Sequence, residues 1–248
     1  VHLAFDHHHS ETIRVDKKDN HIIDPDAPSA ARVVYDYYGG KEKFPSIAED
    51  MMVAVDKGDS AQFTEAKVLK PEGWGLLNML MDSRTGLGRF REFKISNYQL
   101  MMQLIDYCGN HTVDQIVAFP DVKERVDLYF DHEGKFKDQF KRCSTVTGNL
   151  VVFDLRNEET INAGNRFMIY ALFPDCNISI HILWGLNKLN TVLATGKSIL
   201  NKTSNTNIGE LMLKYDSGGH ENAVTCQVEN EDTDRVLAEL TAKITADG

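Results

Sequence analysis

Apolar residues at helical spacing dominate the first half of the chain. They recur three and four positions apart in four segments, which glycine-containing turns separate: 28–38, 46–63, 73–88 and 97–109. Before these segments, Leu3-Ala4-Phe5 is typical of the end of a buried strand. The pattern therefore predicts a helix-rich first domain over residues 1–120 that also contains strand.

A strongly charged stretch with a spaced apolar stripe follows at 121–145. This composition predicts a long surface helix that links two domains, with its charged face solvated. Beyond it, helical segments lie between strand-like runs at 149–155, 178–185, 190–200 and 223–229. Two of these runs are close enough in sequence to pair directly, which predicts a smaller α/β domain with a partly antiparallel sheet over 146–248.

Composition and charge narrow the classes of function. The 248 residues include 27 basic and 37 acidic side chains, for a net charge of −10 and a pI near 5.4. A protein that binds duplex nucleic acid usually presents a basic face, so that class is not expected. An acidic protein can still act on phosphate esters when bound divalent metals reverse the local field.

The cellular location of the protein is predicted from membrane, secretion and cysteine signals in the sequence. No apolar run is long enough to span a bilayer, and no basic segment precedes an apolar one near residue 1, so neither a membrane anchor nor an intact secretory signal is expected. The four cysteines form no CxxC pair, which favours reduced packing residues over a zinc site or a disulfide framework. The sequence therefore predicts a cytoplasmic protein.

The cluster Asp6-His7-His8 is the first candidate for chemistry. Side chains at the carboxyl end of a strand in an α/β sheet point toward the crevice where ligands bind. One histidine can ligate a divalent metal while a neighbouring carboxylate orients a ring, and the next histidine can contact an anion. An incidental polar turn or the remnant of a purification tag would give similar residues, but the run is short and lies between LAF and SET.

An acidic turn after a helical segment supplies a second candidate. Asp56 can reach the same metal from another element, although an aspartate in a turn is most often only a turn residue. Asp59 lies in the same turn, and spacing alone does not exclude it.

The third candidate is the glycine pair in YDSGGHENAVTCQ, residues 215–227. Adjacent glycines let backbone amides approach phosphate oxygens, and His220 can add a hydrogen bond or a positive charge. A helix end followed by a strand would look the same. Lys197 and Ser198 lie in or beside the preceding strand, and Ser198 is a further candidate contact to substrate.

Together these features resemble the DHH phosphoesterase family. The order DHH, then an aspartate after an apolar segment, then a linker, then GGH before a strand matches that family over essentially the whole chain. The chain is most similar to the exopolyphosphatase-like branch of this family in four sequence segments, FDHHHSE, ARVVYDYYGG, NRFMIYALFPD and GKSIL. The resemblance implies a partial DHH domain, with a parallel sheet and helices, joined by a linker helix to a mixed-sheet α/β DHH-associated (DHHA1) domain.

The resemblance also implies chemistry and site residues. The family is a two-lobed hydrolase in which two divalent ions, commonly Mn²⁺ with Mg²⁺ or Co²⁺ as alternatives, activate a water that attacks phosphorus. It assigns metal binding to His7 and Asp56, and catalytic roles to Asp6, as the supporting carboxylate, and to His8, which faces the reacting phosphate. His9 is a bystander. The residues expected to hold the substrate's phosphate in the second lobe are Gly218, Gly219 and His220, with Ser198 beside them.

Two departures from the family pattern change the expectation. The family places an Asp-x-Asp motif and a further metal-binding Asp upstream of DHH, and only five residues precede Asp6 here. We therefore expect the chain to be a fragment of a longer protein and to hydrolyse little by itself. Asp216 stands where the family usually has glycine, and Ala223-Val224 stands in place of an Ala-Gly pair, so the clamp is unusual.

The leading hypothesis is a metal-dependent phosphoesterase acting on a small substrate such as polyphosphate, a short oligonucleotide or a nucleotide. The alternative is a non-catalytic module that binds nucleotide or phosphate. A role of the second lobe in dimer contacts also stays open, so a homodimer is a possible assembly.

Overall fold

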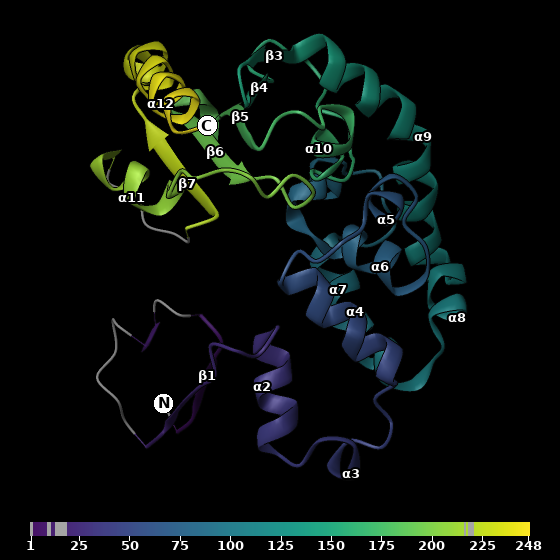
Figure 1. Ribbon diagram of the computed structural model, residues 1–248. Coiled ribbons are helices and arrows are strands. Elements are labelled where there is room, and N and C mark those ends of the chain that lie inside the picture. Colours follow the sequence, from purple (N-terminus) through teal and green to yellow (C-terminus); the bar gives the residue numbers. More distant parts are fainter. Residues whose placement is uncertain (1, 9–10, 13–18, 216, 218–220) are drawn as a thin grey trace. The chain divides into compact units, whose positions relative to one another are not determined.

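The computed structural model describes residues 2–8, 11–12, 19–215, 217 and 221–248. The chain divides into two compact units, Val1–Leu128 and Tyr129–Gly248 (Figure 1). Each unit contains its own sheet and its own helices. Among the described helices, none combines the length and the apolar character needed to cross a membrane.

The first unit holds a small parallel sheet next to a helix. Strand β1 (Ala4–Asp6) pairs with β2 (His21–Ile23), so that Asp6 lies opposite Ile23 at the carboxyl ends of both strands. Helix α2 (Ala30–Tyr37) contacts β1, as Figure 1 shows. The chain thus returns to the carboxyl edge of the sheet before α2 begins.

Short helices make up the rest of the first unit. In chain order they are α3 (Gly40–Lys43), α4 (Glu49–Asp59), α5 (Glu65–Leu69), α6 (Gly73–Met81), α7 (Asn97–Asn110) and α8 (Val113–Ala118). Helices α4 and α6 run side by side in the same direction. Trp74 Nε1 donates to Asp50 Oδ2 at 2.9 Å near their starts, and Gly58 lies against the Asn78 amide near their ends.

Helix α9 (Pro120–Cys143) is the longest helix of the described chain and passes from the first unit into the second. Its buried residues recur at three- and four-residue spacing, as in Val122, Arg125, Tyr129, His132 and Phe136. Its exposed face carries Lys–Asp and Lys–Glu pairs four residues apart, including Lys123 with Asp127 at 2.6 Å. The predicted long charged helix is therefore present.

The second unit is built on a five-stranded mixed sheet. Its strands, in the spatial order β3-β4-β5-β6-β7, are Ser144–Thr147, Leu150–Asp154, Ile178–Trp184, Thr191–Lys197 and Ala223–Val228. Strands β4 and β5 are parallel, and the other neighbouring pairs are antiparallel. Trp184 at the end of β5 donates from Nε1 to the Arg156 carbonyl at 2.8 Å.

Successive side chains along each strand point alternately to the two faces of this sheet. Helices α11 (Ile208–Met212) and α12 (Thr233–Asp247) cover one face, where Ile180, Leu193 and Leu240 are fully buried (Figure 1). On the other face, Phe140 of α9 contacts Phe153 of β4, with ring centroids 4.3 Å apart. Helix α10 (Met168–Leu172) also meets this face, because Tyr170 Oη lies 2.8 Å from Ser179 Oγ of β5.

The mixed α/β architecture confirms the predicted fold class, including a parallel pair in the first unit and a partly antiparallel sheet in the second. The two units meet within α9, at residues 128 and 129. The boundaries at 120 and 146 that the sequence predicts stay predictions.

Candidate functional site

Asp6 ends β1 and organises the turn that follows it. Its Oδ1 accepts backbone N–H bonds from His7 and His8, at 2.7 and 2.8 Å, and lies 2.6 Å from His8 Nδ1. Burial opposes ionisation of this carboxyl, but the hydrogen bonds from His8 and His7 outweigh it and hold the pKa of Asp6 below its usual value. Asp6 is therefore an ionised carboxylate that fixes the orientation of the His8 ring.

The ring of His7 is held from both sides. Its Nδ1 lies 3.1 Å from the carbonyl oxygen of Ala27, in the loop before α2. A proton on Nδ1 donates to that carbonyl and leaves the lone pair of Nε2 for another partner. Nε2 lies 3.1 Å from Asp59 Oδ2, and the His7 side chain is only 13% exposed.

Asp59 is the last residue of α4, and the end of this helix has a defined geometry. The amide of Ser60 donates to the Asp56 carbonyl, and the amide of Gln62 donates to the Lys57 carbonyl, both at 3.0 Å. Ala61 between them has a φ of +53°. The bond from Gln62 to Lys57 closes this helix end as in a Schellman motif, with alanine at the left-handed position. Asp59 thus lies beside the turn after β1.

Asp56, one turn earlier on α4, has different partners. Its Oδ2 accepts from Arg32 Nε at 3.1 Å and from Arg32 Nη2 at 2.5 Å, and its Oδ1 accepts from Ser29 Oγ at 2.7 Å. The hydrogen bond to Asp56 raises the pKa of Arg32 above its ordinary value. The structure thus brings Asp59, not Asp56, to His7, and the metal-binding role of Asp56 stays a prediction.

The donor chemistry of His7 and Asp59 fits a divalent metal. Two donors at right angles around an ion, each about 2.1 Å from it, lie about 3 Å apart, close to the observed separation of 3.1 Å. An imidazole nitrogen and a carboxylate oxygen suit Mn²⁺. No group of three or more His, Cys, Asp or Glu side chains within the described residues gathers as a metal site, so the pair supplies part of a ligand set.

In the second unit, the structure describes only some of the predicted substrate contacts. Ser198 follows β6 and is 4% exposed, and its Oγ accepts from the amides of Leu200 and Asn201 at 3.2 and 2.9 Å. Lys197 Nζ lies 3.1 Å from Glu221 Oε1. Gly218, Gly219 and His220, like Asp216 and His9, lie outside the described residues, so their predicted roles stay predictions.

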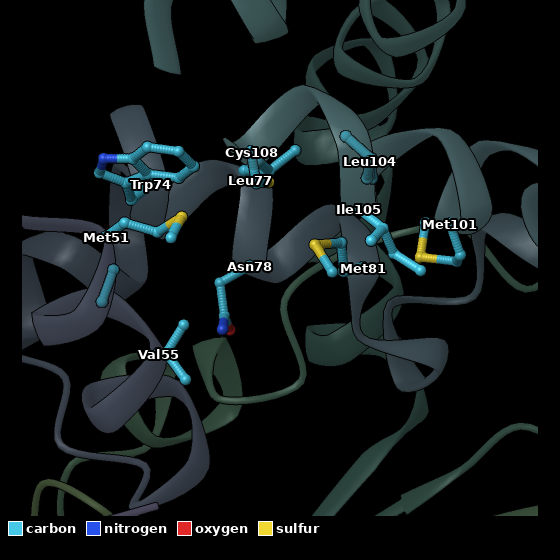
Figure 2. A pocket seen from close by; sticks show the side chains of 11 residues that line it. Met51, Val55, Trp74, Leu77, Asn78, Met81, Met101, Leu104, Ile105 and Cys108 are labelled. Atoms are coloured by element: carbon cyan, nitrogen blue, oxygen red, sulfur yellow. The ribbon is translucent and has the colours of Figure 1, made fainter. Parts of the chain in front are cut away.

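A separate groove in the first unit has the wrong chemistry for a phosphate. Residues of α4, α6 and α7 line a cavity of about 230 Å³ (Figure 2), among them Met51, Trp74, Met81 and Ile105. Its lining is almost wholly apolar and includes none of the predicted site residues. The residues of this unit that are proposed for chemistry therefore lie outside the groove.

Sequence reasoning did not find Ala27, Ser29 and Arg32. The Ala27 carbonyl has no sequence signal, because any residue supplies one. Ser29 has one, since a serine directly after Pro28 and before an apolar helical pattern is a typical N-cap, and its Oγ accepts from the Arg32 amide at 3.0 Å. Its second bond, to Asp56, depends on the tertiary fold.

Comparison with known proteins gives one strong likeness. A pGpG-specific phosphodiesterase, PggH from Vibrio cholerae, is 60% identical to the chain, with a TM-score of 0.82, and the match covers 100% of this chain and 80% of that one. An exopolyphosphatase-related protein from Bacteroides fragilis is 14% identical, with a TM-score of 0.51 over 98% of this chain and 64% of that one, a likeness in fold alone. No protein-family model and no curated protein matches the chain.

Proposed function

Because the chain belongs to the DHH family of phosphoesterases, we propose that it is a metal-dependent hydrolase that cleaves the phosphodiester of a short linear dinucleotide such as pGpG. The observation that carries the proposal is the approach of His7 and Asp59 directly after the strand that ends in Asp6. The substrate class is suggested by the 60% identity to the pGpG-specific phosphodiesterase. The alternative, a phosphate-binding module without turnover, is an outcome of the test.

His7 Nε2 and Asp59 Oδ2 would hold a divalent ion, Mn²⁺ by preference and Mg²⁺ or Co²⁺ as substitutes. When bound, such an ion lowers the pKa of a coordinated water and offsets charge on a phosphoryl oxygen. A hydrogen bond from Nδ1 of His7 to the Ala27 carbonyl would leave Nε2 to face the ion. The remaining ligands of the two-ion site come from solvent, substrate or groups beyond the described residues.

His8 would act on the reacting phosphate. Asp6 holds its Nδ1 at 2.6 Å, and the side chain is 40% exposed, so a substrate can reach the ring. An imidazolium at this position donates a proton toward a phosphoryl oxygen or the leaving oxygen. In pGpG, water adds to the bridging phosphorus, the bond to the 3′ oxygen breaks, that oxygen takes a proton, and two molecules of GMP result.

We assign the substrate's other phosphate to the second unit, where the resemblance gives this role to Gly218, Gly219, His220 and Ser198. Amide groups of adjacent glycines and a histidine suit a phosphate. The hydroxyl of Ser198 already accepts two amide hydrogen bonds, so it is available to a ligand chiefly as a donor. A small substrate is also compatible with a net charge of −10, which disfavours long nucleic acid.

Hydrolysis of pGpG with Mn²⁺ by the purified full-length protein, with GMP quantified by anion-exchange chromatography, tests the proposal. We expect Asp59→Asn and His8→Ala each to lower kcat/KM by roughly 10²–10⁴-fold. Asp106→Asn, an exposed substitution on α7, is the matched control and should leave turnover unchanged. Asp56→Asn distinguishes the two carboxylates, because it should reduce turnover less than Asp59→Asn.

Two results would count against the proposal. GMP formation that survives both Asp59→Asn and His8→Ala would remove these residues from the chemistry. Tight binding of pGpG without turnover, at any Mn²⁺ concentration, would favour the binding module instead.

A further inference from the structure

Ser29 lies where the start of α2 meets α4, the helix that carries the donor Asp59. It is fully buried, and its hydroxyl both caps α2 and donates to Asp56 of α4. Ala27, whose carbonyl holds the ring of His7, lies two residues before it. Asp59, the other donor, lies three residues after Asp56 on the same helix.

Arg32 completes a three-residue cluster with Ser29 and Asp56. Its Nε and Nη2 both bond to Asp56 Oδ2, while Ser29 bonds to Oδ1, so each oxygen of the carboxylate has a partner from α2 or its cap. The Arg32 guanidinium also lies over the Tyr35 ring, 5.4 Å from its centroid. Four contacts therefore fix Asp56 and Arg32 in place.

The cluster is sheltered from solvent. The side chains of Arg32 and Asp56 are 19% and 14% exposed. Removing one partner of a sheltered ion pair leaves the other charge poorly solvated, so the three residues behave as one unit. Lysine would not replace Arg32 fully, because an ammonium lacks the planar fork that bonds through two nitrogens.

A second, weaker link ties the same elements together. The Ala30 amide, in the first turn of α2, lies 3.4 Å from Asp59 Oδ2, the oxygen that also faces His7. A shift of α4 relative to the start of α2 would therefore move Asp59 away from His7. The bonds from Ser29 and Arg32 to Asp56 oppose such a shift.

We propose that Ser29, Arg32 and Asp56 form a positioning cluster that sets the distance between His7 and Asp59. The inference rests on the proposed metal pair and gives Asp56 a supporting role in place of ligation. The three residues act through the Ala27 loop and the last turn of α4, without touching the ion. Their loss changes metal affinity and the state of the His7 ring more than it changes the fold.

The test compares Ser29→Ala, Arg32→Gln and Arg32→Lys with Arg84→Gln in the full-length protein. Arg84 forms a 2.8 Å ion pair with Asp82 in the same unit, and its side chain is 60% exposed, so it is a matched control. Mn²⁺ affinity is measured by titration calorimetry, the fold by thermal unfolding, and the His7 ring by ¹H–¹⁵N NMR without metal, assigned with His7→Gln.

We expect Ser29→Ala and Arg32→Gln to weaken Mn²⁺ binding about tenfold or more, as supporting residues of metal sites do. Arg32→Lys should recover part of this loss, and Arg84→Gln should change nothing. In the NMR spectra, Ser29→Ala and Arg32→Gln should shift the ring-nitrogen signals of His7 from their wild-type positions, because the ring loses its fixed distances to the Ala27 carbonyl and to Asp59.

Unchanged Mn²⁺ affinity and unchanged ring-nitrogen signals of His7 in folded Ser29→Ala and Arg32→Gln would overturn the positioning role. The NMR measurement separates this outcome from failure of the proposed function. If the wild-type protein binds no Mn²⁺ but Ser29→Ala still shifts the ring-nitrogen signals of His7, the cluster positions His7 and the metal proposal fails.

Discussion

Ala61 has a φ of +53°, directly after the helix end that carries Asp59. A left-handed conformation brings the Cβ of an L-residue close to its own carbonyl and costs about 1–2 kcal/mol, which is why glycine is usual at this place in a Schellman motif. Strain of this kind is often found beside functional groups. Here the surrounding hydrogen bonds of Ser60 and Gln62 hold the turn.

Replacing Ala61 with glycine should therefore stabilise the protein. Relief of the left-handed strain outweighs the added flexibility of the unfolded chain, and we expect a net gain of about 0.5–1 kcal/mol in the free energy of unfolding. Urea denaturation followed by circular dichroism measures this gain. Ala54→Gly, within α4, should instead lose about 1 kcal/mol, and a loss in both variants would contradict the assigned strain.

At the level of elements, the apolar patterns were sufficient for most of the fold and for part of the site. The four strand runs of the second unit, the charged linker helix and helices α2, α4, α6 and α7 of the first unit have strong periodicity, whereas the short helices α3, α5 and α8 were not predicted. Strand β3, with the sequence STVT, has mostly exposed side chains, and β2 has only three residues, so neither had a pattern to detect. Both form through pairing with neighbours.

The choice between Asp56 and Asp59 shows the same limit within the site. The two carboxylates are one turn apart on α4, and either spacing suits a metal. What separates them is the start of α2, which gives Asp56 its partners Ser29 and Arg32 and leaves Asp59 to His7. These contacts join residues that are 24 or more positions apart in the chain, and a local sequence pattern does not reveal such pairs.

Helix α12 shows how the burial of a side chain determines its contribution to stability. Leu240 is fully buried against the sheet of the second unit, whereas Leu237 is only partly buried. We expect Leu240→Ala to cost about 2–5 kcal/mol, because it removes buried methyl groups and leaves a cavity, and Leu237→Ala to cost less. Urea unfolding monitored by circular dichroism gives both values, and equal losses would contradict this packing.

For the whole molecule, a histidine in the second unit should make stability depend on pH. The His181 ring packs on Phe140 and Phe153, and burial, aided by the charge of Arg166, lowers its pKa from 6.5 to about 4. Between these values the unfolded chain binds a proton that the folded protein does not. The contribution of His181 to the free energy of unfolding is therefore largest above pH 6.5 and decreases as the pH drops toward 4.

The loss between pH 7 and pH 5 should be about 2 kcal/mol for this group, measured as the change in unfolding free energy in urea. His181→Gln removes the titrating ring and should reduce the pH dependence by that amount. His111→Gln in the first unit is the control and should keep it. Identical pH dependence in wild type and His181→Gln would show that the ring is protonated as readily in the folded protein.

The chain's two tryptophans fall one in each unit, Trp74 against Asp50 and Trp184 against the Arg156 carbonyl. Indole fluorescence shifts to longer wavelength when a ring that is held in the fold becomes hydrated. A Trp74→Phe protein would then emit from the second unit alone, and a Trp184→Phe protein from the first. Each unit thus has its own intrinsic fluorescent reporter. Two emission curves can therefore show whether the units unfold together or one after the other.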